Sequence, residues 1–139
     1  MIRSVSLSLM IASLCLPAAA MAKGTGYECA IKAPGNNGWL PEVLFIGHDT
    51  TSHAVVVSDP IILYYNDRQP IQGRVKTDNA KRTTFAWKLD AKSNSNQRVT
   101  ITYTATYLKG SGEVTMQAMP LGYANIFHGK GRCEVKTLK

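Results

Sequence analysis

The clearest pattern in the chain is an alternation of apolar and threonine residues over positions 99–108. One face of this segment would carry Val99, Ile101, Tyr103, Ala105 and Tyr107, and the other face four threonines. A period of two predicts a β-strand with one face buried and the other exposed. Segment 82–89 repeats the pattern, since Phe85, Trp87 and Leu89 alternate with more polar or smaller residues.

Shorter runs of strand-forming residues begin at residue 27, each bounded by clusters of turn-forming residues. These runs cover 27–32, 43–47, 54–58, 61–65, 71–77, 113–118 and 131–136. The residues between 71–77 and 82–89, and between 99–108 and 113–118, predict two hairpins. Beyond the first 22 residues no segment has helical periodicity over two turns, so no helix is predicted.

About eight strands at this spacing predict an all-β domain. We expect a small antiparallel up-and-down barrel of about eight strands, and a β-sandwich is the alternative. The chain has 139 residues, which suits a single domain, here placed at 23–139. The interior of such a barrel has room for side chains or for one small ligand.

Residues 1–22 have the pattern of a signal peptide. An apolar run over 5–16 precedes the small residues 20–22, which fit the A-x-A cleavage pattern, so cleavage is expected before Lys23. Cys15 lies in this segment but matches a lipoprotein signal poorly. A secreted or periplasmic bacterial protein is therefore predicted, without a membrane span, because no later apolar run approaches the required length.

Two cysteines remain after residue 22, Cys29 and Cys133. An exported protein with an even number of cysteines predicts a disulfide, and only one pairing is possible. The bridge would join the first and last strands, which favours closure of the sheet and removes its edges. A metal or redox pair is the alternative, but the chain has no C-x-x-C motif.

The chain contains 16 Lys and Arg against nine Asp and Glu, a net charge of +7. If Phe85 faces the core, four basic side chains share one outer face of the predicted hairpin 71–89: Arg74, Lys76, Arg82 and Lys88. This face predicts an anionic partner, either an envelope component such as lipid headgroups or peptidoglycan, or an acidic protein. Nucleic acid is not expected, because the face lacks interleaved aromatic residues. A solvated face that maintains solubility is the alternative.

Aromatic side chains on the opposite face give a second hypothesis. Phe85, Trp87, Tyr103 and Tyr107 are predicted to point into the barrel, where they would line a site for a small apolar or amphiphilic ligand. Alternatively, they fill the core. Trp39 lies between loop-forming residues and is expected at the surface or as a plug of one barrel end.

Enzymatic chemistry is not predicted. The chain has no G-x-S-x-G, P-loop or H-E-x-x-H motif, and neither a cofactor nor a metal is expected. His48 and His53 bracket one polar loop and would bind zinc or copper only if they converged with a carboxylate. Two exposed loop histidines are the simpler interpretation, because their spacing matches no metal motif.

Five segments together resemble a group of small secreted proteins of alphaproteobacteria: 27–29, 39–41, 85–88, 122–125 and 129–133. This resemblance implies export and brings no activity or site residues to the chain. In outline, the layout is also similar to the periplasmic lysozyme inhibitors of the small β-barrel type, although their serine- and tyrosine-rich loop motif is not evident here. An inhibitor would use a protruding loop, for which 34–41 and 119–128 are the candidates.

These observations predict an exported, non-enzymatic binding or envelope-associated module that uses its basic outer face. A small-ligand carrier that uses the barrel interior and a protein inhibitor that uses surface loops remain the alternatives.

Overall fold

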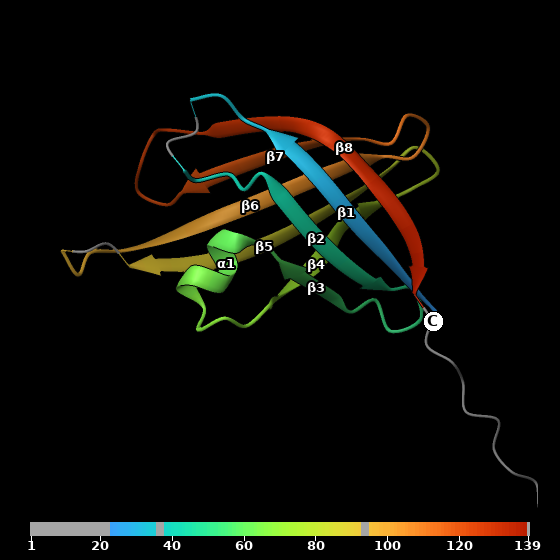
Figure 1. Ribbon diagram of the computed structural model, residues 1–139, viewed down its shortest axis with the longest axis horizontal. Coiled ribbons are helices and arrows are strands. Elements are labelled where there is room, and N and C mark those ends of the chain that lie inside the picture. Colours follow the sequence, from blue (N-terminus) through green and yellow to red (C-terminus); the bar gives the residue numbers. More distant parts are fainter. Residues whose placement is uncertain (1–22, 36–37, 93–94, 139) are drawn as a thin grey trace, which may run out of the picture.

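The computed structural model describes residues 23–35, 38–92 and 95–138 (Figure 1). The predicted signal peptide, with Cys15, lies outside the described residues. Within them, eight antiparallel strands and one short helix follow one another along the chain. The elements are β1 (Gly24–Lys32), β2 (Val43–Asp49), β3 (Val55–Ser58), α1 (Pro60–Tyr65), β4 (Ile71–Asp78), β5 (Arg82–Lys92), β6 (Arg98–Leu108), β7 (Glu113–Pro120) and β8 (Phe127–Leu138).

The eight strands form one closed barrel in which every strand pairs with its neighbours in the chain. Closure comes from β1 and β8, which pair along the whole of β1, from Gly24 opposite Leu138 to Lys32 opposite Lys130. The prediction of a small antiparallel up-and-down barrel is confirmed, and the sandwich alternative is wrong. Closure gives every strand a neighbour on both sides, but residues 74–78 of β4 extend beyond the short strand β3 and pair only with β5.

The core fills the inside of the barrel. Phe85, Trp87 and Tyr103 are only 1 to 2% exposed, and Tyr107 lies partly buried at the edge of the same cluster. The rings of Trp87 and Tyr103 stack with their centroids 5.5 Å apart, while Phe85 meets Tyr27 edge to face at 5.2 Å. Three of the four predicted interior residues are therefore part of the core, and Tyr107 packs against it with its ring 5.1 Å from that of Tyr27, as expected for a filled interior.

The two ends of the barrel differ. At one end lie the chain termini of the barrel and the short turns that follow β2, β4 and β6 (Figure 1). The opposite end carries the connections between β1 and β2, β5 and β6, and β7 and β8, together with α1 (Figure 1). We call this second end the loop-rich end.

The structure differs from the sequence prediction at 61–65, where a strand was expected and α1 forms instead. Asp59 caps this helix, since its carboxylate accepts a hydrogen bond of 2.7 Å from the backbone N–H of Ile62, and Pro60 occupies the first turn. Only Ile62 of the helix is fully buried. The prediction that the chain has no helix is therefore wrong at this position. A helix of six residues spans fewer than two turns and displays no helical periodicity, so the Asp-Pro pair is its only sequence signal.

Candidate functional site

Strands β4 and β5 place the four predicted basic residues on the outside of the barrel. Along β5, Phe85 and Trp87 face the core, whereas Lys88 is exposed. Arg74 is exposed on β4 and lies opposite Ala86. Lys76 and Arg82 are exposed as well. The outward position of all four cations follows from the alternation of a half-buried strand.

A β-bulge in β4 changes the position of Lys76 relative to β5. The pairing of β4 with β5 shifts between Val75, opposite Phe85, and Thr77, opposite Thr84, so that Lys76 has no partner of its own. A bulge places two residues of one strand against one residue of its neighbour and re-aims their side chains. Lys76 and Thr77 both line the same outer cleft as a result.

This cleft has a volume of about 230 Å³ and crosses four neighbouring strands, β4 to β7. We call it the basic cleft; it is lined by Lys76, Thr77, Arg82, Thr84, Thr104, Thr106, Thr115 and Gln117. The lining thus offers two cations, several hydroxyls and one amide, and includes no carboxylate. Thr84 and Thr106 hydrogen-bond to each other across β5 and β6 at 2.9 Å.

Asp78 and Asp90, the acids nearest in sequence to Lys76 and Arg82, do not line the basic cleft. Asp78 accepts hydrogen bonds from Lys109 Nζ at 2.8 Å and from the Thr83 hydroxyl at 3.0 Å. The contact with Lys109 is the main reason why the pKa of Asp78 lies below its usual value. Asp90 accepts a hydrogen bond from Thr100. Within the described residues, the side chains of Lys76 and Arg82 make no ion pair, so their charge faces the solvent.

Sequence reasoning found only part of this site. Arg74 and Lys88 lie on the same outer face as predicted, but they do not line the cleft. The contributions of Thr115 and Gln117 were missed. Their place depends on the pairing of β6 with β7, in which Thr106 lies opposite Thr115. The sequence predicts the hairpin of 99–108 with 113–118, but the prediction did not include the register, which places Thr115 and Gln117 opposite Thr106 and Thr104.

The two histidines differ in burial. His48 is the third inward residue of β2 after Leu44 and Ile46, and it is 4% exposed, with its ring edge to face against Phe85 at 5.7 Å. His53 is exposed in the following turn. The interpretation of both as exposed loop residues is therefore wrong for His48, because β2 continues two residues beyond the predicted run 43–47. Among the described residues, no three His, Cys, Asp or Glu side chains gather closely enough to hold a metal ion.

His48 gives the barrel a testable pH dependence. Its Nε2 atom is buried without a hydrogen-bond partner in the described structure, and burial lowers the pKa of the ring, against a smaller opposing effect of Asp78. The unfolded chain then binds a proton more readily than the folded one, so stability falls as the pH drops below about 6.5. We expect His48→Phe to show a weaker fall in the denaturation midpoint between about pH 7 and pH 5.

The exposed His128 provides the control for this experiment. His128→Gln removes a histidine from the surface and is expected to keep the pH dependence of the parent protein. An equal pH dependence in His48→Phe and in the parent would contradict the buried histidine as its source.

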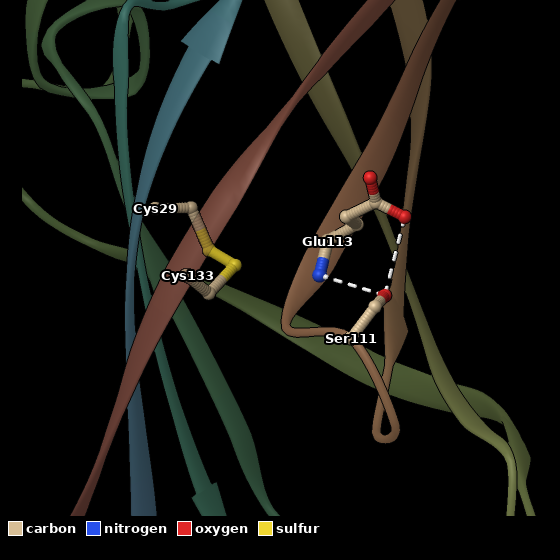
Figure 2. The surroundings of a disulfide bond; sticks show 4 residues. All are labelled: Cys29, Ser111, Glu113 and Cys133. Atoms are coloured by element: carbon tan, nitrogen blue, oxygen red, sulfur yellow. Dashed lines mark hydrogen bonds between the residues drawn. A yellow bond between two sulfur atoms is a disulfide. The ribbon is translucent and has the colours of Figure 1, made fainter.

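The predicted disulfide is present and closes the barrel seam (Figure 2). Cys29 on β1 and Cys133 on β8 lie directly opposite each other, and Cys29 is only 1% exposed. The turn after β6 lies beside them, and the backbone N–H of Cys133 donates to the carbonyl of Gly112. In the same turn, Ser111 hydrogen-bonds to Glu113 (Figure 2). A disulfide is consistent with an oxidising location outside the cytoplasm.

Comparison of the chain with known protein families, with curated proteins and with solved structures finds no match. In the part of the chain that the structure describes, no helix has the length and apolar character needed to cross a membrane. The clefts of the barrel and their charge are therefore the features that bear on its function.

Proposed function

We propose that the protein is an exported, non-enzymatic binding module that associates with an anionic glycan of the cell envelope through its basic cleft. The observation that carries this proposal is the lining of the cleft, which contains Lys76, Arg82, threonine hydroxyls and the Gln117 amide but no carboxylate. Charge-assisted hydrogen bonds from lysine and arginine are among the strongest contacts that a protein makes with carboxylate and phosphate groups.

The other lining residues favour a glycan over a lipid surface. Hydroxyl and amide groups both donate and accept hydrogen bonds, which suits the hydroxyls of a sugar chain. Proteins that lie on membranes generally insert apolar side chains beside their basic residues. The lining of the basic cleft includes no large apolar side chain, so it has nothing to insert.

The packed interior supports a surface role over a carrier role. Trp87 and Tyr103, which a carrier would use to line its ligand site, stack on each other and are almost fully buried. Because the interior is filled, we expect a partner to bind on the outer surface, where the basic cleft lies.

Binding to purified peptidoglycan sacculi tests this proposal. The double variant Lys76→Glu/Arg82→Glu is expected to bind sacculi about tenfold more weakly than the parent protein, because charge-assisted contacts are lost. Binding of the parent should also weaken as salt rises from about 50 to about 300 mM, since the cleft is exposed and salt screens its charge. Co-sedimentation of the protein with sacculi at each salt concentration measures both effects.

The double variant Lys32→Glu/Arg68→Glu serves as the matched control. Lys32 and Arg68 are exposed cations that do not line the basic cleft, so this variant makes the same change of charge elsewhere. Equal binding of the double variant and the parent would contradict the proposal. Preferential binding of the parent to phosphatidylglycerol vesicles, or equal binding to an uncharged glucan, would contradict it as well.

A further inference from the structure

A second cleft opens at the loop-rich end of the barrel and differs in chemistry from the basic cleft. Its volume is about 280 Å³. We call it the aromatic cleft; it is lined by Trp39, Gln97, Arg98, Val99, Pro120, Tyr123, Asn125 and Phe127. Three aromatic rings, a valine and a proline make most of this lining apolar. The cleft lies between the two loops, 34–41 and 119–128, that the sequence singled out as candidate interaction loops.

Residues that line the aromatic cleft are anchored to the core beneath it. The hydroxyl of Tyr103 donates a hydrogen bond of 2.9 Å to the backbone carbonyl of Trp39, and the neighbouring Leu40 is 4% exposed. Burial raises the pKa of Tyr103, so the hydroxyl stays protonated and remains a donor. On the other side of the cleft, Phe127 begins β8 and packs against the core cluster. Fixed walls reduce the entropy lost when a ligand binds.

The charged side chains beside this cleft carry a net positive charge. Arg98, the first residue of β6, lies directly opposite Lys92, the last residue of β5. Like charges in directly opposed positions of two strands destabilise the pair, and an anion beside them relieves this repulsion. Asp90, the acid on the same face of β5, accepts a hydrogen bond from the neutral hydroxyl of Thr100 and offsets one of these two cations, which leaves a net charge of +1. The lining itself includes no carboxylate.

We propose that the aromatic cleft binds a small aromatic acid, with a planar ring bearing a carboxylate or sulfonate. The ring lies among Trp39, Tyr123 and Phe127, where offset or edge-to-face contacts are available. The anionic group pairs with the guanidinium of Arg98, whose planar fork matches two oxygen atoms. A saccharide fits less well, because its hydroxyls would lie unpaired against Val99 and Pro120. The mouths of β-barrels are common positions for ligand sites.

Fluorescence titration with 8-anilinonaphthalene-1-sulfonate tests this proposal, and the uncharged N-phenyl-1-naphthylamine serves as the comparison ligand. We expect Arg98→Gln to weaken binding of the sulfonate about tenfold and to change binding of the neutral amine less than about twofold. Tyr123→Ser should weaken both ligands about fivefold, because an aromatic contact is lost. Tyr123 is 62% exposed, so its replacement leaves the core intact.

Phe45→Ala is the matched control, because Phe45 is an exposed ring, 45% accessible, on the outer face of β2 and outside the aromatic cleft. Its removal should leave both titrations unchanged. The proposal is overturned if Arg98→Gln binds the sulfonate as tightly as the parent, or if Phe45→Ala weakens binding as much as Tyr123→Ser.

The aromatic cleft is also independent of the basic cleft. Lys76→Glu/Arg82→Glu should retain parental affinity for the sulfonate, whatever the result with sacculi. A loss of sulfonate binding in this variant would assign the probe to the basic cleft and would overturn the second site.

Discussion

Replacing both Cys29 and Cys133 with alanine is expected to lower the free energy of unfolding by about 4 kcal/mol. The two cysteines are 104 residues apart in the sequence, so the bridge restricts nearly the whole described chain when it is unfolded. In the chain-entropy model, the stabilisation by a disulfide grows with the logarithm of the loop that it closes, and a loop of this size lies near the upper end of the usual range. Urea denaturation, followed by circular dichroism, measures the difference.

The stability of the reduced parent protein distinguishes the effect of the crosslink from the effect of packing by the sulfur atoms. It keeps both side chains and lacks only the S–S bond, so its stability should match that of the double alanine variant to within about 1 kcal/mol. Both should show a steeper dependence on urea, because an uncrosslinked unfolded chain exposes more surface. A parental midpoint in the double variant would show that pairing of β1 with β8 closes the barrel without help from the bridge.

The barrel architecture could be predicted because each of its sequence signals either lies within one segment or allows a single interpretation. The alternation over 99–108 fixes which face of β6 is buried, and the structure places Ile101, Tyr103 and Ala105 in the core. The disulfide followed from having only two cysteines in the predicted exported chain. Together, a series of hairpins and a link between the first and last strands favour a closed up-and-down sheet.

The composition of the two clefts could not be predicted in the same way. The basic cleft needs Thr84, Thr106 and Thr115 in one row, and this row depends on the pairing of three strands. It also depends on the bulge at Lys76, for which the sequence has no glycine or other signal. The alternation rule correctly assigns side chains to the outer face, but it does not say which strands bring them together.

The aromatic cleft and the buried His48 could not be predicted from local sequence patterns either. Trp39 and Tyr123 lie 84 positions apart in turn-rich segments, where neither period two nor period 3.6 applies. They meet only because both connections emerge at the loop-rich end (Figure 1). His48 looked like a loop residue because polar residues follow it. Its ring is nevertheless inside, since the pattern of β2 continues through it.

Gly131→Ala is expected to destabilise the barrel by about 3 kcal/mol or more, because β8 passes too close to β1 at this position to admit a side chain. A Cβ atom at residue 131 would overlap the carbonyl oxygen of Ala30 and would lie 2.8 Å from its carbonyl carbon and 3.0 Å from the Cα of Ile31. These are backbone atoms of a paired strand, so they cannot turn away as a flexible side chain would. Relief of the overlap requires that the two strands separate beside the disulfide.

Gly47→Ala distinguishes this overlap from the general effect of adding a methyl group to a strand. Gly47 lies in β2, and a Cβ atom there would meet no atom within 4 Å. Since glycine is a poor strand residue, this control is expected to change the free energy of unfolding by no more than about 0.5 kcal/mol, or to raise it slightly. Urea denaturation of the two variants beside the parent gives the comparison. Equal stabilities for Gly131→Ala and Gly47→Ala would mean that β1 and β8 lie further apart at Gly131 than the structure places them.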